Sequence, residues 1–221
     1  NIEFKEHVSG SLSYKSATDT KNDLQKIISE QLTANGFSEI MNNSLTAEAY
    51  YEELVTYPQG KCVKLLNPLS NDLSVMRQTL LFGGLESIAH NINRKRSNLK
   101  MYEFGNVYFF NAEADDSEKV LAKFSEHASL GVWMTGEDIE GNWAQPSRKV
   151  TVYDLKAVVE NIIARLGITE SELVMQQTSN DIFSAALTIN NRGGKKIGEL
   201  GVVKHSILKK MDIEQPVFFA E

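Results

Sequence analysis

Apolar residues spaced three and four positions apart predict three long helices, over residues 19–34, 81–94 and 152–166. Each repeat gathers its apolar side chains on one side of a helix, which suits packing against a sheet. Thr18 or Asp19 can cap the first helix, because side-chain oxygens there accept hydrogen bonds from free backbone N–H groups. The positions that mark the inner side of this helix, one of them polar, are Leu24, Ile27, Ile28, Gln31 and Leu32.

Runs of β-branched and aromatic residues predict strands between these helices. The predicted strands cover residues 37–45, 61–66, 99–110, 130–135, 173–177, 185–190, 195–203 and 216–220. Short helices are predicted over 46–55 and 204–211, a solvated loop over 112–126, and a bend or bulge at Gly105–Asn106. Neighbouring strands join without long crossovers, which favours an α+β fold: an antiparallel sheet flanked by helices.

Composition and charge narrow the class of protein. The 221 residues carry a formal net charge of −6, and an acidic module of this kind is a poor general binder of phosphate backbones. One cysteine, Cys62, allows no internal disulfide, which predicts a reducing, cytoplasmic location and a core role for the thiol. No apolar run has the length of a membrane helix. We expect one module over 1–221, cut from a longer protein, because the chain begins without Met and stops within an apolar run.

The usual catalytic motifs are missing from the sequence. It has no Gly-rich phosphate loop, and the Gly83–Gly84 pair at the start of a predicted helix either holds an anion or lets the helix approach the sheet. The histidines do not stand at metal-ligand spacing, so neither a metal site nor a catalytic residue is predicted. They are His7, His90, His127 and His205.

One cationic cluster follows the second predicted helix: Arg94, Lys95 and Arg96, with Lys100 nearby. Cations are favoured at a helix C-terminus by the macrodipole, which is a sufficient structural reason for them. Contact with RNA phosphates or with an acidic partner is the functional alternative. The sequence leaves both open.

The stretch 65–110 resembles the beta subunit of bacterial phenylalanyl-tRNA synthetases. The matching segments are Asn67-Pro68-Leu69-Ser70, Met76-Arg77, Leu80-Leu81, the basic run, and Glu103 to Tyr108, with Gly105 in the last of these. Two further segments agree, at 35–40 and at Gly198-Glu199-Leu200-Gly201. The sequence departs from the family pattern at 180–183 and at 202–205, so those loops are expected to differ in shape.

The resemblance implies a class II synthetase-like core that lacks catalysis of its own. In that family the alpha subunit carries the active site, the holoenzyme uses ATP and Mg²⁺, and tRNA is bound mainly by the rest of the complex. Class II adenylation needs two arginines on the phosphates, a role for which the forked guanidinium is suited. Arg77 stands near one of these positions, whereas 198–204 contains no arginine. The resemblance therefore implies that this module binds no cofactor of its own.

Assembly is the role that the resemblance leaves to this module. In class II folds the first long helix and the next strand form the subunit interface, which assigns Leu24, Ile27, Ile28, Gln31, Phe37 and Ile40 to contact with alpha. Ile28→Asp or Phe37→Asp is then expected to prevent co-purification with alpha. The alternatives are a free-standing ligase that adenylates a small acid, which ATP–pyrophosphate exchange would reveal, and direct tRNA contact through the basic cluster.

Overall fold

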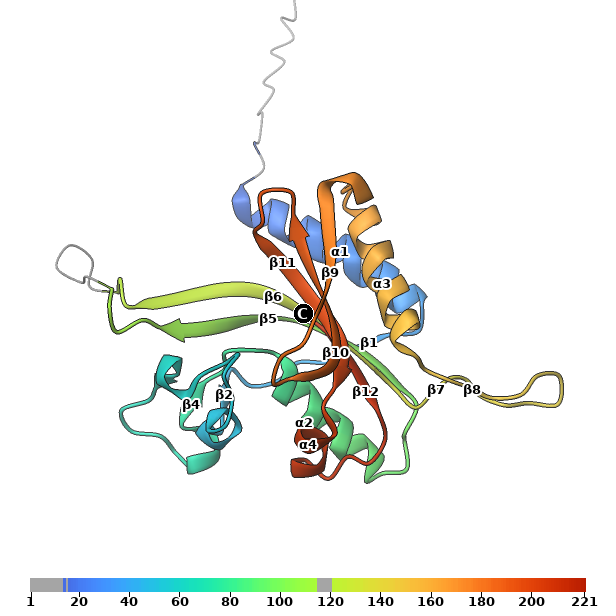
Figure 1. Cartoon of the computed structure of the whole chain (residues 1–221), viewed down its shortest axis with the longest axis horizontal. Helices are drawn as coiled ribbons and strands as arrows, with labels where there is room; N and C mark the ends of the chain where they lie inside the picture. Colours follow the sequence, from blue (N-terminus) through green and yellow to red (C-terminus); the bar gives the residue numbers. More distant parts are fainter. Residues whose placement is uncertain (1–13, 15, 115–120) are drawn as a thin grey trace, which may run out of the picture.

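A seven-stranded sheet forms the centre of the molecule in the computed structural model (Figure 1). The structure describes residue 14 and residues 16–114 and 121–221. The strand order is β1-β5-β6-β12-β11-β10-β9. β1 pairs parallel with β5, and the five other pairings described in this sheet are antiparallel, so the predicted mostly antiparallel sheet is confirmed. The bounds are β1 (Ser38–Glu39), β5 (Leu99–Phe110), β6 (Phe124–Thr135), β9 (Leu173–Thr178), β10 (Phe183–Asn191), β11 (Lys196–Val203) and β12 (Val217–Ala220).

Helices cover both faces of this sheet (Figure 1). α1 (Ala17–Ala34) and α3 (Val152–Arg165) lie together on one face, and α2 (Leu81–Ile92) and α4 (His205–Lys210) lie on the other. The core divides accordingly into two apolar clusters, one on each face. The α+β architecture predicted from the sequence is therefore confirmed, with helix bounds within two residues of the predicted ones.

Smaller elements surround the sheet. A three-stranded sheet joins β2 (Leu45–Thr46), β4 (Val75–Met76) and β3 (Val63–Lys64), and a ribbon joins β7 (Glu137–Ile139) and β8 (Arg148–Lys149). Single 3₁₀ turns are η1 (Glu48–Tyr51), η2 (Gln59–Lys61), η3 (Asn71–Leu73) and η4 (Glu170–Glu172). The short helix predicted over 46–55 is therefore reduced to one 3₁₀ turn.

The predicted strand over 37–45 was wrong in its middle. Only β1 and β2 form, and the chain between them leaves the sheet. Asn42 donates through its side chain to Glu103, and the side chain of Asn43 accepts from the backbone N–H of Leu45. These polar side chains bind other groups in place of a ladder, which is how Asn competes with regular secondary structure.

Three other local predictions also need correction. Ser16, and neither Thr18 nor Asp19, caps α1, with Asp19 completing the capping box. Gly105 forms no bulge, since β5 and β6 pair in unbroken register across it. β6 begins at residue 124, so the end of the predicted 112–126 loop is strand. Residues 115–120 of that loop lie outside the described part of the chain.

Candidate functional site

A buried ion pair joins β5 to the segment after β4. Arg77 Nη1 lies 2.7 Å from Glu103 Oε1, and Arg77 Nε donates to the Asn106 carbonyl oxygen at 2.9 Å. Both side chains are buried. A Cβ on Gly105 would stand 2.2 Å from Arg77 Nη2, so only glycine leaves room for the guanidinium. The structure thus brings three of the motif residues together and fixes Arg77 inside the core.

The second carboxylate oxygen of Glu103 is also engaged. Asn42 Nδ2 donates to Glu103 Oε2 at 2.7 Å, and Ser87 Oγ on α2 donates to Asn42 Oδ1 at 2.9 Å. This network ties β5, the chain after β1 and helix α2 to Arg77. Its hydrogen bonds hold the guanidinium in place, away from any phosphate at the surface.

A cavity of about 250 Å³ opens on the same face of the sheet. Its lining residues include Tyr57, Gln78, Phe109, Phe183, Phe219 and the two acids Glu199 and Glu221. Glu221 accepts hydrogen bonds from the hydroxyl of Thr79 and from the backbone N–H of Leu80. Burial raises the pKa of Glu221 above its usual range, although these hydrogen bonds oppose the rise.

The charges around this cavity do not suit a triphosphate. Glu199 on β11 stands in the late segment where the resemblance requires an arginine, and Lys196 Nζ is already paired with it at 2.6 Å. Asn180 Nδ2 donates to the other oxygen of Glu199 at 2.8 Å. The Lys196 ammonium is therefore already paired, and the other acid, Glu221, has no cation to offer a phosphate, so ATP does not fit the residues that line this cavity.

The predicted interface residues divide into exposed and buried ones. Ile28 and Phe37 are 7% and 4% exposed and belong to the core between α1, α3 and the sheet. Leu24 is 45% exposed on α1, while Ile27, Gln31 and Ile40 are half-buried. Aspartate at Ile28 or Phe37 would disrupt this core, so the two substitutions expected to report on assembly would report on folding instead.

The basic cluster lies near β1, the strand at one edge of the large sheet. Lys95, Arg96 and Lys100 line a shallow hollow of about 580 Å³ that also includes Ser38 and Ile40 next to β1. Lys100 is neutralised by Asp138, 2.6 Å away. Arg94 lies outside the hollow and donates to the His90 carbonyl oxygen at 3.0 Å, which is the helix-terminal role considered from sequence.

The other motif residues have structural surroundings. Asn67 and Pro68 are exposed in the loop after β3, and Met76 pairs with Leu45 in the small sheet. A Cβ on Gly201 would lie 2.4 Å from the Ala185 carbonyl oxygen. On Gly198 it would lie 3.0 Å from the Glu221 carbonyl oxygen. Close backbone approach therefore accounts for both glycines of β11.

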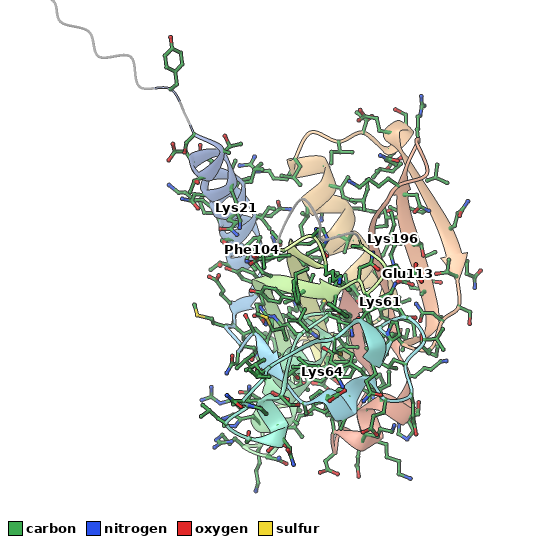
Figure 2. All side chains as sticks on the ribbon, turned by 90° about the vertical axis from the view of Figure 1, so that its left-hand side faces the viewer. Lys21, Lys61, Lys64, Phe104, Glu113 and Lys196 are labelled. Atoms are coloured by element: carbon green, nitrogen blue, oxygen red, sulfur yellow. The ribbon has the colours of Figure 1, made fainter. Side chains whose placement is uncertain are left out.

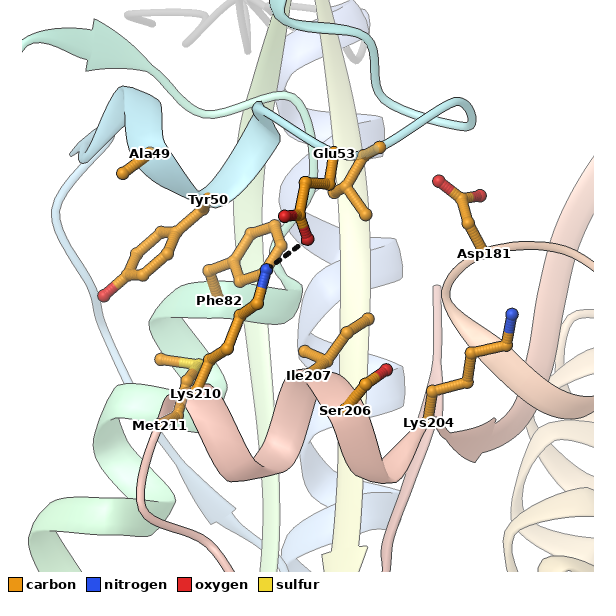
Figure 3. A pocket seen from close by; sticks show the side chains of 11 residues that line it. Ala49, Tyr50, Glu53, Phe82, Asp181, Lys204, Ser206, Ile207, Lys210 and Met211 are labelled. Carbon is orange, nitrogen blue, oxygen red and sulfur yellow. Dashed lines mark hydrogen bonds and ion pairs between the residues drawn. The ribbon is translucent and has the colours of Figure 1, made fainter.

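A smaller pocket of about 180 Å³ lies between α4 and the chain around η1 (Figure 3). Its charged groups are largely paired: Lys210 Nζ lies 2.5 Å from Glu53 Oε2. Asp181 accepts from the backbone N–H groups of Val55 and Thr56. This pocket is therefore a gap between α4 and the chain around η1, two segments that polar contacts hold together.

Sequence reasoning did not assign Gln78, Thr79 and Glu221 to a site, since nothing in a linear pattern brings Glu221 close to the other two. Glu103 offered a signal, because an acid within an apolar strand needs a buried partner. In the described residues no three His, Cys, Asp or Glu side chains lie close enough to hold a metal ion. Nor does any described helix have the length and apolar character to cross a membrane. His7 lies outside the described residues.

Comparisons with known proteins agree with the family resemblance. A family model described as the phenylalanyl tRNA synthetase beta chain CLM domain matches residues 9–221. Proteins named phenylalanine–tRNA ligase beta subunit from Bacteroides fragilis and Bacteroides thetaiotaomicron are 51% and 49% identical to the whole chain. That of Porphyromonas gingivalis is 42% identical. The chain spans 27% of the length of each of these relatives.

Solved structures support the fold. The crystal structure of pyrrolysyl-tRNA synthetase from Desulfitobacterium hafniense matches with a TM-score of 0.64, covering 90% of this chain and 64% of that one. The sequence identity is 12%, so this likeness concerns the fold alone. Together with the family match, it shows that the chain is a class II synthetase-like fold and belongs to the phenylalanyl-tRNA synthetase beta chain CLM domain family.

Proposed function

We propose that this chain is the non-catalytic core module of a phenylalanine–tRNA ligase beta subunit. It pairs with the catalytic alpha subunit in a cytoplasmic enzyme that attaches phenylalanine to its tRNA, using ATP and Mg²⁺ held by alpha. Contact with tRNA is made mainly by other parts of that complex. The relatives named above, each about four times as long as this chain, support this assignment.

The buried Arg77–Glu103 pair carries the proposal that the module is inactive. A guanidinium that binds ATP must be free to meet the phosphate, whereas Arg77 already donates to Glu103 and Asn106 in the core. The neighbouring cavity adds Glu199 and Glu221, which oppose the charge that develops on a phosphate. These charges argue against the alternative of a free-standing adenylating ligase.

The exposed side of α1 supports the proposal that alpha binds there. Leu24 is exposed, and Ile27 and Gln31 beside it are only half-covered by this chain. A partner helix lying along α1 would bury all three. Packing of ridges into grooves between two helices is the geometry that such a surface offers.

Leu24→Asp tests the interface without disturbing the core. We expect the variant to unfold at the same urea concentration as the wild type but to lose co-purification with coexpressed alpha, because a carboxylate would be buried at the contact. Leu166→Asp is the matched control, since Leu166 is 38% exposed at the end of α3 and lies outside the proposed interface. Normal assembly of a folded Leu24→Asp variant would refute the assignment of α1.

Direct RNA contact is a second candidate, favoured by the hollow that Lys95 and Arg96 line. Phosphate contacts there would make tRNA affinity fall with salt. Replacing Arg94, Lys95 and Arg96 together by alanine is expected to reduce both the tRNA affinity of the complex and its salt dependence. An unchanged salt dependence would assign these cations to the helix terminus.

A further inference from the structure

The cavity next to the buried ion pair is lined largely by apolar side chains. Phe109, Phe183 and Phe219 form much of its wall, together with Val107 and Ile182. Its volume of about 250 Å³ lies just below the usual range for small-molecule sites, so it suits a ligand with a single ring. Lys196 marks the β11 side of the cavity and is labelled in Figure 2.

Gln78 contributes a buried acceptor without a partner. The side chain is 1% exposed and lines the cavity. Its Nε2 donates to the Pro58 carbonyl oxygen at 3.1 Å and to Cys62 Sγ at 3.0 Å, which fixes the orientation of the amide. In the described residues Oε1 then accepts no hydrogen bond. A buried acceptor of this kind costs free energy, and it makes the wall of the cavity at Gln78 polar.

The carboxylates add a need for positive charge. Within the part of the chain that the structure describes, no ion pair includes Glu221, whereas Glu199 is paired with Lys196. Burial raises the pKa of Tyr57, which also lines the cavity, and Glu221 raises it further. A cation that donates hydrogen bonds would compensate the carboxylate of Glu221, which no ion pair of the described residues includes.

We propose that this cavity binds a small primary ammonium that carries an aromatic group. The ammonium donates to Glu221 and Glu199, and the ring packs among Phe109, Phe183 and Phe219. A ligand that also carries a carboxylate or phosphate is disfavoured, because its anion would meet these two acids. The proposal is independent of the assembly role, since the cavity and α1 lie on opposite faces of the sheet.

Titration with 2-phenylethylamine tests this site. Trp133 packs on Phe219 with ring centroids 5.1 Å apart, so its fluorescence reports on the cavity wall. Trp143→Phe removes the other tryptophan, which is 99% exposed. We expect a saturable change with the amine, and affinities at least about tenfold weaker for phenylalanine and for 2-phenylethanol, which add an anion or lack the cation.

Two charge variants identify the groups that bind the ammonium. Glu221→Gln and Glu199→Gln are each expected to weaken amine binding about tenfold. Glu30→Gln on α1 changes the net charge equally and is expected to leave it unaltered. Circular dichroism checks that every variant is folded. The proposal is overturned if the folded wild type gives no saturable response, if phenylalanine or 2-phenylethanol binds as tightly, or if both cavity variants bind normally.

Discussion

Glu103 is the buried carboxylate on which the Arg77 and Asn42 contacts depend. Glu103→Ala would leave a buried guanidinium without its partner, and we expect it to lower the free energy of unfolding by about 3–5 kcal/mol. Urea unfolding at neutral pH measures the change. Glu30→Ala, at an exposed position on α1, is expected to change stability by less than about 0.5 kcal/mol. Equal stabilities of the two variants would contradict this account of Arg77.

Asp181 gives stability a specific dependence on pH. Burial raises the pKa of Asp181, but hydrogen bonds from Thr56 and Val55 outweigh that effect and hold the pKa below its usual value. A carboxyl whose folded pKa is lowered stabilises the protein above the unfolded pKa of about 3.9, and this stabilisation is lost as the pH falls through the folded pKa.

Asp181→Asn is therefore expected to destabilise the protein at pH 7, with the difference from wild type shrinking as the pH falls below about 4. Urea unfolding at a series of pH values measures it. Asp212→Asn, an exposed control, should stay within about 0.5 kcal/mol of wild type throughout. A difference that stays constant down to pH 3 would rule out this role for Asp181.

Helix α2 approaches the sheet through Gly84. A Cβ there would lie 2.1 Å from Trp133 Cε2, and Trp133 is fully buried. The Gly83–Gly84 pair was expected either to hold an anion or to let the helix approach the sheet. The contact of Gly84 with Trp133 supports the second interpretation. Gly84→Ala is expected to lower stability by about 1–3 kcal/mol through overpacking, despite the higher helix propensity of alanine.

Gly60→Ala provides the control for this prediction, because an added Cβ there has no neighbour within 4 Å. We expect it to unfold at nearly the same urea concentration as the wild type. Near-ultraviolet circular dichroism would show whether Trp133 has shifted in the Gly84→Ala variant. Wild-type stability of that variant would mean that α2 and the sheet are less tightly packed than the geometry indicates.

Elements with a strong apolar period were predicted well, and those shaped by polar side chains were not. The periodic residues of α1, α2 and α3 gave bounds within two residues of the observed ones. The strand predicted between β1 and β2 does not form, because Asn42 donates a hydrogen bond to Glu103, 61 residues away. Such a contact leaves no trace in local spacing. The Ser16 cap did leave one, because Ser16 and Asp19 stand at the three-residue spacing of a capping box.

The candidate site depends on the whole molecule, which explains why the sequence predicted only part of it. Family motifs identified Arg77, Glu103 and Gly105, which lie within 28 residues of one another in the sequence and in contact in the fold. Thr79 and Glu221 are 142 residues apart, and only the placement of β12 inside the sheet brings them together. The missing arginine in 198–204 was visible in the sequence, whereas the acidic cavity beside it required the structure.

Phenylalanine-dependent ATP–pyrophosphate exchange tests most directly the proposal that alpha is catalytic and that this module is not. The assay compares this chain alone with the complex of alpha and beta subunits at the same concentration. We predict no exchange above background by the chain, since Arg77 is bound to Glu103 and the adjacent cavity is acidic, and clear exchange by the complex. Exchange by the purified chain alone would contradict the account.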